Sequence, residues 1–459
     1  MLKVIKSIPK ENIFFKEESI AKGNFPEGTE GAVVNLYDDV KYQEVLGFGG
    51  AFTESAAYNY SLMDEETKKE VIKLYFDKKE GIGYNFGRTH INSCDFSLDT
   101  YSYVADGDKT LESFDISRDK KYIIPFLKDA LAHSEEELVL FASPWSPPGY
   151  MKDTGSAIKV AGKHSHLLDE YKEAWAHYYA KYVKAFDREG IKISAISIQN
   201  EPIAGCAWET CYYSPEDERE LIEKYLIKAL DEEGLSDLKI IIWDHNKERV
   251  YDRAKKVLES DAVRERVWAV GHHWYTGDHF DGLRLVHEVL DKPLISTEFC
   301  GTIDCDRIEM AERYAKEITG DFNNFGIGVC DWNLILSQNG GPYHNRNEKT
   351  VSIPGVVHDD VEGGCLAPIL YDNEKKELIV TPVYYYMGHF SKFIKRGAKR
   401  LAVSKYDERL FVTAFENPDG EKVMIITNTA DIELPAVIRN NDVCTNIQMA
   451  PHSIMTVIM

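Results

Sequence analysis

The stretch that decides the fold is Ile196-Ser-Ile-Gln-Asn-Glu-Pro202, a short apolar run that ends in a glutamate and a proline. The same pattern recurs in Pro293-Leu-Ile-Ser-Thr-Glu-Phe299. Apolar runs of this length, rich in β-branched residues, are typical of buried strands. From residue 45 onward such runs alternate with amphipathic helical segments. That alternation predicts a parallel sheet with crossover helices.

Eight strand candidates can be counted along this part of the chain. They are Val45 to Gly49, Tyr84 to Thr89, Leu138 to Ala142, Ile193 to Gln199, Lys239 to Trp243, Val267 to Trp274, Pro293 to Thr297 and Gly326 to Asp331. Helical periodicity fills the intervals, for example at 64–76, 167–187, 215–232 and 307–322. Eight βα units predict an α/β protein with a (β/α)8 TIM barrel.

The chain is longer than a barrel requires. Its 459 residues fit a barrel of roughly 250 to 350 residues and a second domain. After a predicted helix at 383–394, short strands and the hairpin turn Asn417-Pro-Asp-Gly420 indicate a β-sandwich. We expect one or two amino-terminal strands to join it. The predicted domains are 1–42 (strands of the sandwich), 43–395 (catalytic barrel) and 396–459 (carboxyl-terminal β-sandwich).

Charge and composition exclude several classes of partner. The net charge of −22 would repel nucleic acid and anionic membranes, so a neutral substrate is expected. No run of 18 apolar residues suggests a membrane span, and Met1-Leu-Lys-Val-Ile-Lys-Ser7 lacks the apolar region of a signal peptide. We expect a cytoplasmic protein, or a secreted one if a signal has been trimmed. The eight cysteines show no CxxC spacing, which favours reduced thiols over zinc. The sequence is compatible with a homo-oligomer and does not fix the oligomeric state.

Two glutamates are the strongest candidates for chemistry. Glu201 follows the fourth predicted strand and Glu298 the seventh, so both project from the carboxyl-end face where barrel active sites lie. A carboxylate at the end of a buried strand is costly to desolvate unless it is paired or used. Either residue alone could simply cap the next helix. Together they match the requirement of glycoside hydrolysis for one proton donor and one nucleophile or base.

Polar and aromatic side chains accompany both glutamates. Asn200 precedes Glu201, and its amide could hydrogen-bond a sugar 2-hydroxyl. On the sixth strand His273 and Tyr275 share the face toward the barrel mouth, because alternate residues of a strand point the same way. A phenol there could hold a nucleophilic carboxylate. A satisfied core histidine and a packed tyrosine are the plainer interpretation.

Four further candidates lie at the ends of other strands. An inward Arg88 would keep a nearby carboxylate ionised by pairing with it, and a purely structural ion pair is an equal alternative. Asp95, in the loop that follows, could bind sugar hydroxyls. Trp145 and Trp332 follow the third and eighth strands and suit the CH faces of a sugar. Simple packing is equally compatible with both tryptophans.

Competing motifs match poorly. Gly47-Phe-Gly-Gly50 fails as a dinucleotide fingerprint, because Phe52 occupies the place of the third glycine. His272 and His273 suggest a metal site, but neighbouring strand residues point to opposite faces and cannot easily ligate one ion. The sequence therefore predicts neither a metal nor a cofactor.

Taken together, the motifs resemble glycoside hydrolase family 30, and most closely its glucosylceramidase branch. The resemblance covers nearly the whole chain. It rests on Gly47-Phe-Gly-Gly-Ala-Phe-Thr53, Gly81-Ile-Gly-Tyr-Asn85, Ser93-Cys-Asp-Phe-Ser97, Ala142-Ser-Pro-Trp145, Asn200-Glu-Pro202, His273-Trp-Tyr275, Thr297-Glu298, Asp331-Trp-Asn333 and Gly388-His-Phe-Ser-Lys-Phe393. The loop Ile203-Ala-Gly-Cys-Ala-Trp208 departs from that branch, which leaves the aglycone open.

The resemblance implies a retaining mechanism with Glu201 as acid/base and Glu298 as nucleophile. It also implies a sugar subsite and two residues that support the nucleophile, Arg88 and His273. The implied subsite residues are Asp95, Trp145, Asn200, Tyr275, Trp332 and Asn347. The expected activity is an exo-acting β-glucosidase on a neutral β-linked sugar. A β-xylosidase, a β-1,6-glucanase, a non-catalytic carbohydrate-binding protein and a metal-dependent hydrolase are the alternatives.

Overall fold

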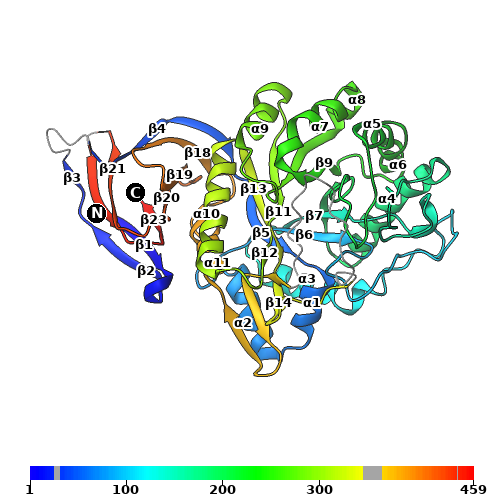
Figure 1. Cartoon of the computed structure of the whole chain (residues 1–459), viewed down its shortest axis with the longest axis horizontal. Helices are drawn as coiled ribbons and strands as arrows, with labels where there is room; N and C mark the ends of the chain where they lie inside the picture. The colour runs from blue at the N-terminus through cyan, green and yellow to red at the C-terminus, as the bar shows by residue number, and fades with distance from the viewer. Residues whose placement is uncertain (25–30, 345–363, 442) are drawn as a thin grey trace.

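A closed barrel of eight parallel strands forms the larger part of the molecule (Figure 1). The computed structural model describes residues 1–24, 31–344, 364–441 and 443–459. In chain order the barrel strands are β5 (Gly47–Ala51), β6 (Phe86–Ile91), β7 (Val139–Pro144), β8 (Ile193–Ser197), β9 (Lys239–Asn246), β10 (Val267–His273), β11 (Leu294–Glu298) and β13 (Gly326–Asn333). The predicted TIM barrel is confirmed, and Glu298 is the last residue of the seventh strand.

One apolar side chain from each of seven barrel strands fills the interior. These side chains are Phe86, Phe141, Ala195, Ile241, Ala269, Ile295 and Cys330. The remaining strand, β5, is rich in glycine because it lies unusually close to β6. A Cβ atom on Gly49 would stand 1.5 Å from the carbonyl oxygen of Phe86. The glycine motif thus permits close backbone packing.

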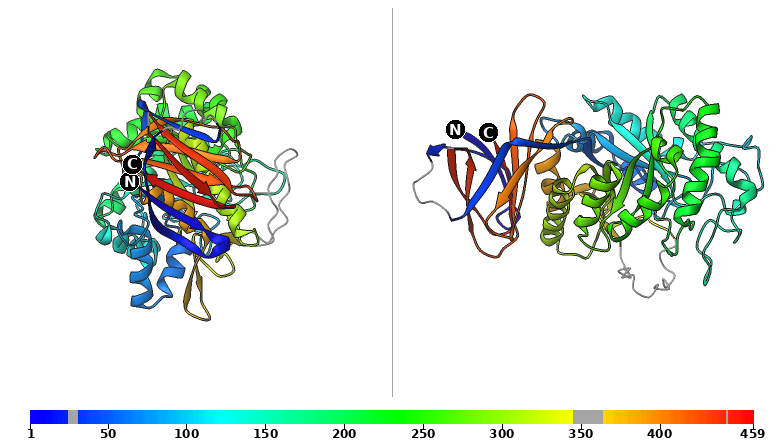
Figure 2. Two further views of the ribbon diagram at one scale, coloured as in Figure 1. Left: turned by 90° about the vertical axis from the view of Figure 1, so that its left-hand side faces the viewer. Right: turned by 90° about the horizontal axis from the view of Figure 1, so that it is seen from above.

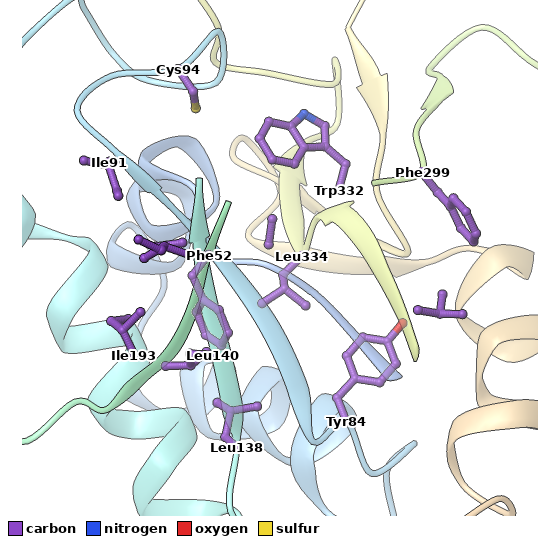
Figure 3. Close-up of a cluster of buried hydrophobic side chains, with 14 of the residues drawn as sticks. Phe52, Tyr84, Ile91, Cys94, Leu138, Leu140, Ile193, Phe299, Trp332 and Leu334 are labelled. Carbon is purple, nitrogen blue, oxygen red and sulfur yellow. The ribbon is translucent and has the colours of Figure 1, made fainter. Parts of the chain in front are cut away.

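Helices surround the barrel, and a second apolar layer lies between them and the strands. Figure 3 shows Phe52, Leu140 and Ile193 in this layer, with Trp332 above them. Side chains cap the start of two of these helices: Asp64 accepts a hydrogen bond from the Thr67 amide, and Ser214 forms a capping box with Asp217. The helices are α1 (Glu54–Ser61), α2 (Glu65–Phe76), α3 (Ile123–His133), α4 (Lys172–Arg188), α5 (Pro215–Glu220), α6 (Ile227–Glu232), α7 (Val250–Val257), α8 (Asp261–Arg266), α9 (Phe280–Leu285), α10 (Arg307–Asn323) and α11 (Pro382–Ser391). Within the described ranges, no helix is both long enough and apolar enough to span a bilayer.

The β-sandwich is built from both ends of the chain (Figure 2). Its ten strands pair in the order β2-β1-β23-β20-β19-β18-β4-β21-β22-β3. Four strands precede the barrel, where we expected one or two, and β21 and β22 were not predicted. The strands are β1 (Leu2–Ile8), β2 (Ile13–Ile20), β3 (Gly23–Asn24), β4 (Val33–Glu44), β18 (Lys399–Lys405), β19 (Leu410–Glu416), β20 (Lys422–Asn428), β21 (Leu434–Asn440), β22 (Val443–Met449) and β23 (Ser453–Ile458).

Two helices join the barrel to the sandwich. His389 of α11 contacts the hydroxyl of Ser7 on β1 and that of Thr456 on β23, each at 2.8 Å. On α10, Phe322 packs edge-on against Phe415 of β19 with ring centroids 5.3 Å apart. Burial lowers the pKa of His389 to about 3, so this joint holds a neutral imidazole at ordinary pH.

Candidate active site

A polar layer lies directly above the apolar interior of the barrel. Residues two positions apart on a strand share a face, so Arg88 stands above Phe86, and Ser143 stands above Phe141. Ser197 occupies the same level on the next strand, β8, and its hydroxyl lies 2.8 Å from that of Ser143. The layer therefore lies at the carboxyl ends of the strands, which is where a barrel of this kind presents its chemistry.

Arg88 is fully buried and connects four other side chains in this layer. Its guanidinium donates to Glu298 Oε2 at 2.7 Å, Asn200 Oδ1 at 2.8 Å, Asp244 Oδ2 at 2.9 Å and Ser143 Oγ at 3.1 Å. Burial opposes the charge of Arg88, but Asp244 and Glu298 outweigh it and raise the pKa of the guanidinium. A buried ion pair is costly to break because the remaining charge is stranded. Arg88 therefore fixes Glu298 and the Asn200 amide in one geometry.

The second oxygen of Glu298 is held by a phenol. Tyr275 donates its hydroxyl to Glu298 Oε1 at 2.7 Å, and the Tyr275 amide is anchored to Asn246 Oδ1 at 2.9 Å. Glu298 thus receives a strong donor on each carboxylate oxygen while 9% of its side chain stays accessible. Charge-assisted hydrogen bonds of this kind stabilise the ionised carboxylate and fix its direction.

Glu201 lies opposite, beside two imidazoles. Its Oε1 atom is 3.2 Å from His273 Nδ1 and 3.3 Å from His245 Nδ1. Burial alone would raise the pKa of Glu201, but His245 and His273 outweigh burial and hold it well below its usual range. Burial would lower the pKa of His273, and the neighbouring carboxylates, Glu298 first, raise it to about 9. At neutral pH the proton of this group therefore resides on the imidazole.

Glu201 itself has a left-handed backbone, with φ of 49°. Its amide donates to the carbonyl of Asp244 at 3.0 Å, which ties the loop after β8 to the end of β9. Non-glycine residues in this region carry a conformational cost of about 1–2 kcal/mol. Trp243 and Asp244 share the conformation, at 72° and 52°. Three residues with this backbone conformation thus lie where the acidic groups meet.

Sequence reasoning missed Asp244 and His245. Asp244 is fully buried and accepts from Ser197 at 2.6 Å and Ser143 at 2.9 Å, and its second oxygen faces His273 Nε2 at 3.1 Å. The signal was present, because the run Lys239 to Trp243 is followed at once by Asp-His-Asn. That is the pattern of a strand closed by polar residues which singled out the two glutamates.

The predicted subsite is only partly assembled in the described residues. Trp145 and Trp332 stack on each other at 5.2 Å with a 27° tilt and flank the Arg88 guanidinium at 4.7 and 5.5 Å. Both indoles are nearly inaccessible, so their contact with a sugar stays a prediction. Asp95 is buried beside Phe96, whose ring meets Trp332 edge-on at 6.0 Å. Asn347 lies outside the described residues.

In the part of the chain that the structure describes, one group of side chains could hold a metal ion. Donor atoms of Glu201, His245 and His273 lie within 4.8 Å of one another. The sequence argument against a metal considered only the neighbours His272 and His273. That argument holds for His272, which lies near Lys247, where burial and this cation keep the pKa of His272 well below its usual value. It does not exclude a metal, because the adjacent strand supplies His245.

Comparisons with known proteins agree with this geometry. The glycosyl hydrolase family 30 TIM-barrel model matches residues 45–394, and the β-sandwich model of the same family matches 397–457. Lysosomal acid glucosylceramidase of Mus musculus is 29% identical over 468 residues, covering 95% of this chain and 87% of the relative. The structure of SrfJ from Salmonella typhimurium superposes with a TM-score of 0.92 at 31% identity, covering 100% and 99% of the two chains. An endo-β1,6-glucanase structure gives 0.84 at 26% identity, with the same coverage.

Proposed function

The chain belongs to glycosyl hydrolase family 30, and we propose that it is a retaining, exo-acting β-glycosidase that releases glucose from β-glucosides. In this proposal Glu298 attacks the anomeric carbon, and Glu201 protonates the leaving oxygen. Glu201 then deprotonates the water that frees the sugar from Glu298. The chemistry uses two carboxyl groups and needs no cofactor.

The observation that carries the proposal is the contrast between the two carboxyl groups. Glu298 is held by Arg88 on one oxygen and Tyr275 on the other, each at 2.7 Å. That environment fixes the direction of a nucleophilic carboxylate. Glu201 has no such clamp and faces two imidazoles instead. Carboxyl groups placed in different environments are typical of a division into nucleophile and acid/base.

The spacing supports retention of configuration. Glu201 Oε1 and Glu298 Oε1 lie 3.2 and 4.0 Å from the same atom, His273 Nδ1. The two oxygens are therefore within about 7 Å of each other. Retaining glycosidases hold their carboxyl groups about 5–5.5 Å apart, whereas inverting enzymes use about 6.5–9.5 Å to admit a water. Most of the carboxyl separations found in inverting enzymes are therefore larger than the separation possible here.

His273 is placed to supply the proton that Glu201 lacks. With a pKa near 9, its imidazole carries a proton at neutral pH, 3.2 Å from Glu201 Oε1. This proton is positioned to pass to Glu201 and then to the leaving oxygen. Asp244 on the far side of the ring fixes the orientation of the imidazole, as a carboxylate does for other catalytic histidines.

The glycone and linkage are tested with a panel of aryl β-glycosides. We expect the highest kcat/KM on the β-glucoside, with the β-xyloside, β-fucoside and β-galactoside lower. Proton NMR of the first sugar released should show the β-anomer before mutarotation. An α-anomer would overturn the retaining mechanism. No turnover of any of these by folded protein would favour a carbohydrate-binding role.

A second candidate is a β-1,6-glucanase, which the similarity to the endo-β1,6-glucanase structure favours. A β-1,6-linked gluco-oligosaccharide with a reduced end distinguishes the two modes. Exo action should release glucose alone from the first minutes. Early release of disaccharides and longer products would assign endo action to this chain.

A further inference from the structure

The imidazoles beside Glu201 are spaced like ligands of a transition-metal ion. Glu201 Oε1 is 3.2 Å from His273 Nδ1 and 3.3 Å from His245 Nδ1. In a tetrahedral zinc site with bonds of about 2.0–2.1 Å, two ligand atoms stand about 3.3–3.4 Å apart. Two edges of the tetrahedron are therefore already formed. Donor atoms of all three residues lie within 4.8 Å of one another.

The second ring nitrogen of His273 makes the contact with a carboxylate that is typical of a metal-binding histidine. Its Nε2 atom is 3.1 Å from Asp244 Oδ1, and a ligating histidine almost always donates its other ring N–H to a carboxylate or carbonyl. With Nε2–H facing Asp244, Nδ1 faces Glu201, and a metal ion that binds there takes the place of the Nδ1 proton. Two acceptors this close require a cation between them, either a proton or a metal ion. Asp244 is itself fixed by Arg88, Ser143 and Ser197.

His245 provides an independent observation. Only 5% of the residue is exposed, and among the described residues its Nδ1 atom has no hydrogen-bond partner. The 3.3 Å approach of this nitrogen to Glu201 Oε1 lacks hydrogen-bond alignment. A buried ring nitrogen without a hydrogen-bond partner destabilises the folded state. A metal ion between the two side chains would satisfy it.

We propose that Glu201, His245 and His273 form a binding site for a divalent transition-metal ion of the zinc class, and that the bound ion inhibits the enzyme. Two imidazoles and one carboxylate suit zinc and similar ions, whereas Mg²⁺ and Ca²⁺ prefer oxygen ligands. The ion would occupy the oxygen of Glu201 that exchanges the catalytic proton. Binding is independent of the proposed function, and only the inhibition rests on it.

Binding is tested directly with Zn²⁺ and Co²⁺ on protein dialysed against EDTA. Titration calorimetry should show one Zn²⁺ site in the wild type, weakened about tenfold or more in His245→Gln, which removes one ligand. His166→Gln is the matched control, because it removes an exposed imidazole outside the cluster, and it should bind as the wild type does. Equal affinity in wild type and His245→Gln would overturn the proposal.

The spectrum of bound Co²⁺ tests the site without any variant. Four-coordinate Co²⁺ absorbs strongly in the visible region, and Zn²⁺ should remove the band by competition. If the wild type showed no Co²⁺ band that Zn²⁺ removes, the three-ligand site would be contradicted. This result does not depend on whether His245→Gln folds.

Inhibition is measured on an aryl β-glucoside. Zn²⁺ should suppress turnover of the wild type, EDTA should restore it, and Mg²⁺ should have no effect. EDTA alone should leave turnover intact, since the proposed chemistry needs no metal. His245→Gln should need about tenfold more Zn²⁺ for half-inhibition, in line with its weaker binding. If Zn²⁺ inhibited the wild type and His245→Gln at the same concentration, the inhibitory site would be refuted. If the metal-free wild type showed no turnover, the proposed function would be refuted and the binding data would still stand.

Discussion

Replacing Tyr275 by phenylalanine removes one atom from the clamp on Glu298. The hydroxyl lost is the donor at 2.7 Å to Glu298 Oε1, while Arg88 keeps the other oxygen. A hydrogen bond to a charged group contributes about 1.5–3 kcal/mol. At 1.36 kcal/mol per tenfold change in rate, kcat/KM should fall about 10- to 150-fold. The phenyl ring keeps its edge-on contact with His273 at 6.0 Å, so the fold should be preserved.

The assay is steady-state kinetics on an aryl β-glucoside, with a melting temperature for each protein. The loss should appear in kcat more than in KM, because a neutral sugar does not depend on the charge of Glu298 for binding. Tyr386→Phe is the matched control. It removes a hydroxyl that donates to the carbonyl of His452 at the joint with the sandwich. If folded Tyr275→Phe kept kcat/KM within twofold of the wild type, Tyr275 would have no role in holding the nucleophile.

Three further outcomes are expected. Azide should rescue Glu298→Ala with an α-glycosyl azide and Glu201→Ala with a β-glycosyl azide, read by the anomeric proton in NMR; reversed products would exchange the two roles. Burial raises the pKa of Asp331 to about 7. The neutral carboxyl therefore makes its full contribution to stability below pH 3.8, the pKa of this group in the unfolded chain, and the contribution is lost as the pH rises through 7. Asp331→Asn should therefore gain up to about 4 kcal/mol above pH 7 and almost nothing at pH 4, and melting curves of equal offset at both pH values would contradict this. Gly49→Ala should abolish soluble expression or lower the melting temperature strongly, because its methyl group would meet the Phe86 carbonyl at 1.5 Å, and a wild-type melting temperature would refute this close approach.

The sequence was sufficient for the barrel and for the positions of both glutamates. Buried parallel strands are read as apolar runs, and a carboxylate at the end of such a run is conspicuous. Asp244 and His245 were not predicted because the inward and outward alternation of side chains along β9 breaks there. The backbone of Trp243 and Asp244 is left-handed, and the pairing of β9 with β10 shifts register at the same level. Beyond such a point, no periodicity shows which side chain faces inward.

The sandwich was harder to predict for a different reason. β4 carries charged and polar side chains on half-exposed positions, and β21 contains a proline, so neither has a clean alternating pattern. Their partners are also remote in sequence, since β4 pairs with β18 and β21. Local propensity carries no information on such pairing.

The pairing of β1 with β23 sets an order of events during synthesis. A ribosome adding about 5–20 residues per second needs between about 20 and 90 s for a chain of 459 residues. All eight barrel strands emerge before β18, so the barrel can close while translation continues. Throughout that interval β1 presents an open edge on the side away from β2, because its other partner, β23, follows the whole barrel in the chain. Such an edge is prone to pair with a neighbouring nascent chain. Slower elongation should therefore lower the soluble yield of this protein through the sandwich, even though the proposed catalytic groups all reside in the barrel.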